Sequence, residues 1–475
     1  MRKTIWIGIL SVLAACGSAP ETSLTDRDFI ESFKAILPQE RTLNAVGSPL
    51  PAQVLVSGQI SVTVEGHYGA AQTRDGSWIV QVPDVGARIT AYSTTDGAAG
   101  AALNVRGTNQ TDVHTQNLSL PCAVVPCDAL VVTSTATQGR TVYWSPPGRS
   151  VIDEAVAIVF VPYAVAPGLL RPPAIGNNYL ARFLRTMPLP ESLVDFSKLP
   201  SVVDVDTLGV DWTSWGKNKP EISYLTNLLR RFSGEMYDGW STDTRTPDWQ
   251  HPGYGSAYAS VVSQAAVMLC STASAEAKAP LAYAIVQRGL DQVGATVDGR
   301  TMYPLGGHCA GRKALIVICG HLLNCQAIAD PTAFVGPKFQ EDGYFFGSWW
   351  FGSGWTACWR FRLEPPFDGS MLAQHPRTWG SVNSPNHDSW AWMITGYMAP
   401  VLGAQVGTRT AMKLLGRDKE MGLAFCRMVD QWMMGPPASA VADLASVGIV
   451  FPWQTDWSME KGGDFCAAAW RRYAR

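Results

Sequence analysis

The sequence predicts a two-part chain of class β + α, with an N-terminal β-sandwich followed by an incomplete (α/α) toroid. Residues 51–168 alternate apolar and polar positions in short runs broken by turn residues, a period typical of half-buried strands. Residues 169–475 instead carry long apolar stretches with helical spacing. With 475 residues, of which 47% are hydrophobic and 16% charged, the chain is long enough to build more than one core.

The first sixteen residues, MRKTIWIGILSVLAAC, predict an export signal. A short basic start, an apolar core and small residues ahead of a cysteine form the layout of a cleaved signal rather than of a spanning helix. The four residues LAAC, which end at Cys16, resemble the lipobox of bacterial lipoproteins. That resemblance implies lipidation of Cys16 and a membrane anchor, at the outer membrane of a Gram-negative bacterium. An ordinary secretory signal is the alternative.

Residues 17–50 are predicted to form a tether. They begin with GSAPETSLTDRD, a small and polar composition that is typical of flexible linkers. The β-sandwich that follows, residues 51–168, is expected to be either a packing module or a sugar binder.

Ten cysteines in an exported chain favour disulfides. Cys122 and Cys127, in PCAVVPC, are close enough in sequence to close a small loop, and one disulfide is predicted there. If Cys16 carries lipid, the other nine cysteines cannot all pair. Cys270, Cys319 and Cys426 lie in apolar helical stretches and are expected to be buried thiols.

Apolar segments in the second part predict helices. Several are apolar around almost their whole circumference, and such helices need neighbours on both flanks. A double-layered ring of helical hairpins supplies those neighbours, which is why a toroid is predicted over 169–475; a simple bundle is the alternative. The predicted helical segments are 220–236, 255–273, 279–295, 311–329, 387–405 and 417–434.

In such a ring the chain alternates direction, so the loops ahead of the helices near Tyr254 and Arg312 fall at the same end. Both loops are rich in Trp, Tyr, His, Asp and Arg, which favours a functional surface. The insertion 330–386 is aromatic and has no clear period. By strict alternation the helix near His387 begins at the opposite end, unless the insertion hides a further helix.

The stretch YPLGGHCAGRK predicts an anion site at a helix start. His308, Arg312 and Lys313 lie around the first turn, where free backbone N–H groups already attract anions. Guanidinium adds paired hydrogen bonds to a carboxylate, sulfate or phosphate. The alternative is a solvated helix start with His308 as a loop histidine.

Tyr254 and Tyr258 are four residues apart and share a helical face. They follow Trp249 and His251 closely in the sequence. Phenols can exchange protons, so both tyrosines are candidates for acid or base; as an alternative they lie at the rim of the core with satisfied hydroxyls.

Adjacent carboxylates on an extended chain point apart, so Glu341 and Asp342 are not expected to act as an acid/base pair. One of them is expected to orient His308 or Arg312. His387 and Asp388 follow Asn386, a residue type that caps helices, and are either capping residues or part of the cleft.

Several function classes are excluded by composition or by missing motifs. A net charge of −2 gives no broad positive field, so no nucleic acid is expected as a partner. His308, Cys309, Cys319 and His321 lack the paired cysteine spacing of a zinc site, so no metal centre is predicted. The sequence also carries no Gly-x-Ser-x-Gly elbow, phosphate loop or dinucleotide fingerprint, so no cofactor is expected. Calcium is left open as a structural ion, and a monomer is expected.

A cleft rich in Trp and Tyr favours a carbohydrate polymer, because sugar rings stack on aromatic faces. With Tyr, His and Arg at these loop positions, the helical part resembles the toroid-type polysaccharide lyases, which cleave uronic-acid polysaccharides by β-elimination. The resemblance implies Arg312 on the uronate carboxylate, His308 or Tyr258 as base, and Tyr254 or Tyr258 as acid. The residues expected to bind the anionic polysaccharide are Lys313, His251, Trp249, Tyr344, Trp349, Trp350, Glu341, Asp342 and His387.

Two other functions remain open. An (α/α)-barrel glycoside hydrolase needs two separated carboxylates, for which Asp238 or Asp248 with Asp342 or Asp388 are candidates. A surface glycan-binding lipoprotein needs the same aromatic cleft without turnover.

Overall fold

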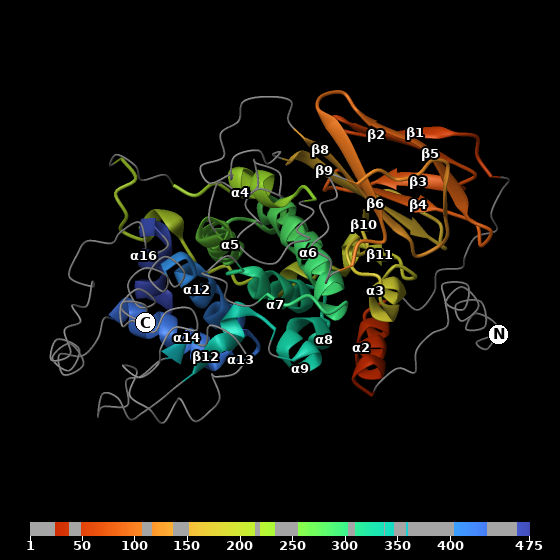
Figure 1. The fold of residues 1–475 in the computed structure, drawn as a ribbon. Coiled ribbons are helices and arrows are strands. Elements are labelled where there is room, and N and C mark those ends of the chain that lie inside the picture. The colour runs from red at the N-terminus through yellow and green to blue at the C-terminus, as the bar shows by residue number, and fades with distance from the viewer. Residues whose placement is uncertain are drawn as a thin grey trace, which may run out of the picture.

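The computed structural model shows a β-rich region followed by a helical region, as the change of period predicts (Figure 1). The ring arrangement of the helices stays a prediction. The residues that the structure describes are 24–37, 49–106, 116–135, 152–213, 219–232, 255–302, 309–336, 338–345, 358–359, 403–434 and 463–475.

Two sheets make up the β-rich region. The first has four antiparallel strands in the order β1-β2-β5-β7: β1 (Gln53–Ser57), β2 (Ile60–Glu65), β5 (Ala87–Thr94) and β7 (Cys122–Val124). The second has five strands in the order β3-β4-β9-β8-β6, and its only parallel pair is β4 with β9. Its strands are β3 (Gly69–Gln72), β4 (Trp78–Gln81), β6 (Ala98–Leu103), β8 (Ala129–Thr135) and β9 (Ile152–Val161).

The five-stranded sheet is buried on both faces. Along β9, Ile158 and Phe160 pack with Ile60 and Val62 of β2, so the two sheets share one core. The alternate residues of β9, such as Val159, pack on the other side against the helical region, together with Ile175, Phe232 and Ala295. This sheet is therefore the middle layer of the molecule, and β8 is buried along its whole length.

The helical region is centred on α6 (Ala275–Val297) and α7 (Arg312–Leu322). A Cβ added at Gly289 would lie 2.3 Å from the Cβ of Cys319, so the glycine permits the close approach of these two helices. The flanking helices are α3 (Tyr179–Leu184), α4 (Ile222–Leu229), α5 (Gly255–Leu269), α8 (Gln326–Ala329), α9 (Pro331–Val335), α12 (Val406–Leu415), α13 (Asp418–Met421), α14 (Leu423–Met434) and α16 (Gly463–Tyr473). Short 3-10 helices are η2 (Glu191–Leu193), η3 (Phe196–Lys198), η4 (Val205–Thr207) and η7 (Gln340–Gly343), and short strands are β10 (Leu169–Leu170), β11 (Leu189–Pro190), β12 (Tyr344–Phe345) and β13 (Cys358–Trp359).

Part of the predicted tether is a packed helix. Helix α2 (Leu24–Ala35) presents Phe29, Ile30 and Phe33 to the core of the helical region. The ring of Phe29 stacks on Phe334 with centroids 4.3 Å apart. The flexible tether predicted for 17–50 is therefore wrong for 24–35, because three apolar residues at helical spacing find a partner surface there.

The predicted disulfide between Cys122 and Cys127 is also wrong, since neither cysteine is in a disulfide. Cys122 lies on β7 and is partly exposed. Cys127 is fully buried, donates its N–H to Phe160 O at 2.7 Å, and accepts from Arg185 Nη1 at 2.9 Å through its carbonyl. The backbone therefore places Cys122 at the surface of β7 and Cys127 in the protein interior.

A buried arginine joins the two regions. Arg171 donates to Asp75 of the β3–β4 loop at 2.9 and 3.0 Å and to Asp291 of α6 at 2.6 and 2.8 Å. Its side chain is 0% exposed. The last guanidinium hydrogen bond goes to Pro172 O at 3.0 Å, so this buried cation is both paired and fully hydrogen-bonded.

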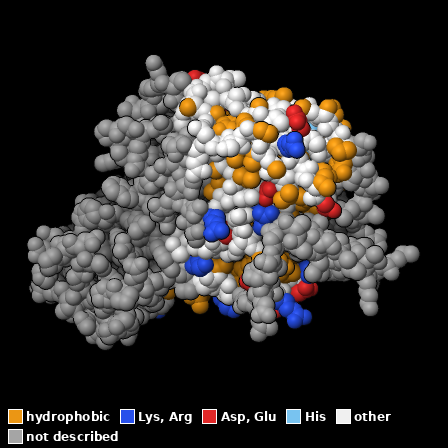
Figure 2. All heavy atoms as spheres, turned by 45° about the vertical axis from the view of Figure 1, so that its right-hand side comes forward, with side chains coloured by type: hydrophobic (Ala, Val, Ile, Leu, Met, Phe, Trp, Pro, Cys, Tyr) orange, Lys and Arg blue, Asp and Glu red, His pale blue; other side chains and the backbone are white. Residues whose placement is uncertain are grey.

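On the face that Figure 2 shows, acidic and basic side chains are interspersed among apolar ones. None of the helices that the structure describes has the length and apolar character needed to cross a membrane.

Candidate functional site

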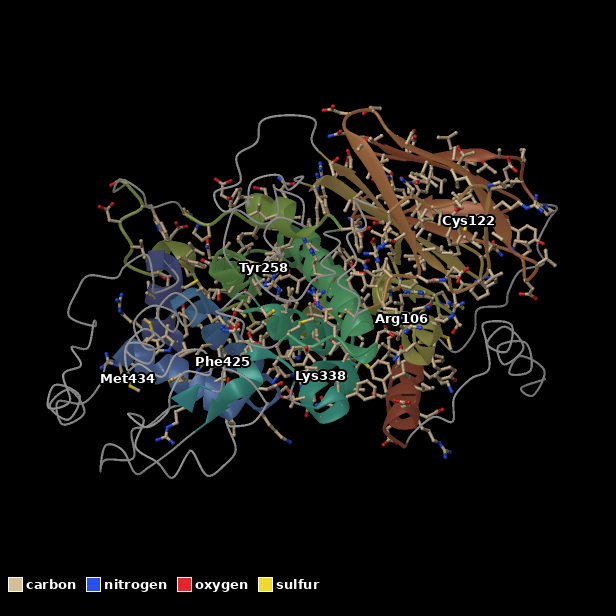
Figure 3. The ribbon with its side chains drawn as sticks, viewed as in Figure 1. Arg106, Cys122, Tyr258, Lys338, Phe425 and Met434 are labelled. Atoms are coloured by element: carbon tan, nitrogen blue, oxygen red, sulfur yellow. The ribbon has the colours of Figure 1, made fainter. Side chains whose placement is uncertain are left out.

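The structure brings together several of the predicted site residues at the start of α7. Tyr258 comes from α5, Arg312 and Lys313 from α7, and Glu341 and Asp342 from η7. Figure 3 labels Tyr258 inside the helical region. The predicted residues that lie outside the described part of the chain are His308, Tyr254, His251, Trp249, Trp349, Trp350, His387 and Cys16, as well as Asp238, Asp248 and Asp388; Tyr344 is described only as backbone in β12.

Arg312 is held against the ring of Tyr258. Its guanidinium carbon lies 4.1 Å from the ring centroid, a cation–π distance, and its Nη1 donates to Ala310 O at 3.0 Å. Gly311 makes this contact between helices possible, because its φ of 84° is left-handed and a Cβ there would lie 3.0 Å from Ala259 Cα. The solvated helix start considered for Arg312 and Lys313 is wrong, since both side chains are buried.

Lys313 and Asp342 form a buried ion pair. Lys313 Nζ donates to Asp342 Oδ1 at 2.6 Å and to Met421 O at 3.0 Å. Asp342 also accepts from Thr332 Oγ1 at 2.8 Å and from Phe339 N at 3.1 Å. The ion pair connects η7 to α7, and the hydrogen bond to Met421 O connects α13 to α7. The Asp342 carboxylate therefore has a structural role.

Glu341 caps the start of α7 with one of its two carboxyl oxygens. Its Oε1 accepts from Gly311 N at 2.8 Å, whereas its Oε2 is buried without a hydrogen-bond partner among the described residues. Burial raises the pKa of Glu341 to about 7, while the Gly311 hydrogen bond and the charge of Lys313 act in the opposite direction. Near neutral pH this carboxyl can therefore either donate or accept a proton.

Gln405 is a buried polar residue at the start of α12 that the sequence did not indicate. It is fully buried, and neither its amide oxygen nor its amide nitrogen has a partner among the described residues. It follows Ala404, which packs with Ala259 and Ala310 in a small buried cluster. Gln405 ends an apolar predicted helix, and its burial depends on contacts between segments that are distant in sequence. We refer to Tyr258, Arg312 and Glu341 as the α5–α7 site.

The residues weighed for zinc do not gather in the described part of the chain, where no group of three or more His, Cys, Asp or Glu side chains is placed to hold a metal ion. His321 Nδ1 accepts from Arg417 Nε at 3.0 Å, and Nε2 lies 3.3 Å from Lys198 O. Burial raises the pKa of the Cys319 thiol well above its usual value, which disfavours the thiolate that metals bind.

Replacing Glu341 with glutamine is expected to remove a pH-dependent part of the stability. The pKa of Glu341 in the folded state, about 7, lies above its ordinary value of 4.5. The folded state is therefore most stable, with respect to this group, below pH 4.5, and the wild type loses this stability as the pH rises through 7. At higher pH the loss in free energy of unfolding reaches about 3 kcal/mol. Urea unfolding from pH 4 to 8 measures it, with the exposed Glu65→Gln as control. A constant difference between Glu341→Gln and wild type across this range would contradict the assignment.

No protein-family model matches the chain, and neither a curated protein nor a solved structure matches it.

Proposed function

We propose that the protein is an exported, lipid-anchored polysaccharide lyase that cleaves a uronic-acid polysaccharide by β-elimination. The observation that carries the proposal is the Arg312 guanidinium stacked on Tyr258, together with Glu341, a buried carboxyl with a pKa of about 7 that binds the N–H of the preceding residue, Gly311. Export and attachment to the outer membrane rest on the first sixteen residues and Cys16. The proposal includes the (α/α) toroid, with the loops before α5 and α7 at one end of the ring.

Elimination requires charge stabilisation on the uronate carboxylate while the C5 proton leaves. Arg312 supplies a planar, permanently charged donor whose orientation is fixed by its stacking and by Ala310 O. Protonated Glu341 supplies a neutral donor through Oε2, the oxygen that has no partner among the described residues. Together they would stabilise the enolate-like form of the substrate.

Two proton transfers complete the reaction. Tyr258 or His308 takes the C5 proton, the electron pair of the C5–H bond forms the C4–C5 double bond, and the C4–O bond breaks. Tyr254 or Tyr258 then protonates the leaving oxygen. The protons and electron pairs of the elimination are thus accounted for without a cofactor.

Chain connectivity links the α5–α7 site to the predicted substrate-binding residues. Tyr254 directly precedes α5, His308 is four residues ahead of Arg312, and Trp349 is four residues beyond β12. These residues are therefore within four positions of α5, Arg312 or β12 in the sequence, which supports a polymer-binding groove beside Arg312.

Ultraviolet absorbance is the direct test. The protein without its first sixteen residues is incubated with alginate, glucuronan, pectate, hyaluronan, chondroitin and ulvan, and absorbance of the unsaturated uronate is followed. We expect a rise with one of these polymers. A flat trace on all six, with protein that is folded by circular dichroism, would overturn the lyase proposal.

The same samples separate the rival functions. New reducing ends without ultraviolet absorbance would indicate a glycoside hydrolase, although Asp342, one of its candidate acids, is held by Lys313. Retention on a polysaccharide gel without any product would indicate a glycan-binding protein.

A further inference from the structure

A cleft of about 180 Å³ lies where the β-rich and helical regions meet, away from the α5–α7 site. Its walls come from the β3–β4 loop, from β10 and η2, and from α4 and α6. We refer to it as the interface cleft. Leu169, Leu170, Pro280 and Ala284 give it an apolar lining. A volume of this size is below the roughly 300–1,000 Å³ of pockets that hold drug-sized ligands, so it suits a molecule of about one sugar ring.

One wall of the interface cleft is held rigidly. Arg74 donates to both carboxylate oxygens of Glu191, at 2.6 and 2.8 Å, and its guanidinium carbon lies 4.5 Å from the ring centroid of Tyr283. Gln287 is also occupied, because its amide donates to Arg171 O and accepts from Arg171 N. These contacts pre-form the cleft and leave the charge of this wall neutralised.

The wall formed by α4 offers two polar side chains that have no hydrogen-bond or ion-pair partner among the described residues. Arg230 is exposed and lines the cleft, and its guanidinium has no ion pair or hydrogen bond among the described residues. Thr226 stands one helical turn earlier, is 9% exposed, and its hydroxyl has no hydrogen-bond partner in the described part of the chain. Buried hydroxyl groups are usually hydrogen-bonded, and a ligand in the cleft would give Thr226 a hydrogen-bond partner.

We propose that the interface cleft binds a small carboxylated sugar, of the size of a single hexuronate. Arg230 binds the carboxylate by a forked ion pair, Thr226 hydrogen-bonds a ring hydroxyl, and the C–H face of the ring packs on Leu170 and Ala284. The binding site does not depend on catalysis at the α5–α7 site. It would hold an acidic sugar at the junction of the two regions whether the protein is a lyase or a binder.

Isothermal titration of the folded protein with glucuronate and galacturonate tests the proposal, with glucose as the neutral analogue and sulfate as a bare anion. We expect at least one uronate to bind about tenfold or more tightly than glucose and sulfate. Arg230→Gln should weaken that binding about tenfold, and Thr226→Val several-fold. Arg231→Gln, which removes the neighbouring exposed charge outside the cleft, should leave the affinity unchanged.

Each other outcome overturns the proposal. Equal affinity for sulfate and the uronates would mean a simple anion site. Unchanged affinity in Arg230→Gln, or no uronate binding to the wild type at millimolar concentration, would mean that the cleft is not the site. Because no variant here touches Arg312 or Glu341, loss of lyase activity and loss of binding in the cleft are distinguishable results.

Discussion

Replacing Asp291 with alanine is expected to lower the free energy of unfolding by about 3–5 kcal/mol. The change removes two of the hydrogen bonds to Arg171, at 2.6 and 2.8 Å, and leaves a fully buried guanidinium with only Asp75 as its charged partner. Because Arg171 lies between the β3–β4 loop and α6, the loss should also weaken the attachment of the two regions. Denaturant unfolding measures the effect.

A surface ion pair provides the control. Asp206 pairs with Lys219 at 2.5 Å, but the two side chains are 73% and 46% exposed, and exposed pairs contribute about 0–1 kcal/mol. Asp206→Ala should therefore change stability little. If Asp291→Ala lowers the free energy of unfolding by no more than Asp206→Ala, the cluster of Arg171, Asp75 and Asp291 does not stabilise the contact between the two regions.

Replacing Arg312 with lysine is expected to reduce elimination activity about 100- to 1,000-fold. Lysine keeps a positive charge near Tyr258 but lacks the planar fork that binds a carboxylate through two hydrogen bonds. Alanine is a poorer test, because Arg312 is buried against Tyr258 and its removal would leave a cavity. The rate of ultraviolet absorbance increase, on the polymer that the wild type degrades, is the measurement.

Arg409 allows a matched control for this substitution. It is a buried arginine on α12, with Asp430 and Asp418 as partners at 2.9 and 2.8 Å. Arg409→Lys should lower the melting temperature without a comparable loss of activity per folded molecule. Wild-type activity in Arg312→Lys would remove Arg312 from the reaction.

Local pattern in the sequence predicted the order of the two regions and a good part of the site. Strand β2 buries Ile60, Val62 and Val64 in strict alternation, and this period is visible in the letters themselves. The stretch around Arg312 indicates a site because its charges precede an apolar run, and the structure places Arg312 against Tyr258. The alternation in β2 and the charges around Arg312 are both patterns of residues that are close in sequence.

Other features depended on partners that are distant in sequence. The sequence predicts a tether where helix α2 lies, because the three apolar residues of this helix are ambiguous until Phe183 and Phe334 are placed beside them. Helices α12 and α16 were not predicted at their observed positions. The predicted disulfide rests on sequence proximity alone, which does not show that Cys122 is partly exposed and Cys127 is buried.

By itself, the sequence determined the change from strands to helices and the gathering of reactive residue types near Arg312, because periodicity and composition are properties of neighbouring residues. Only the tertiary structure decided that Glu341 is buried with a pKa of about 7, that Gln405 is buried at the start of α12, and that Arg230 and Thr226 line a cleft between the two regions. Burial, unpaired polar atoms and cavities arise where segments far apart in the chain meet, and their free energies depend on those contacts rather than on local order.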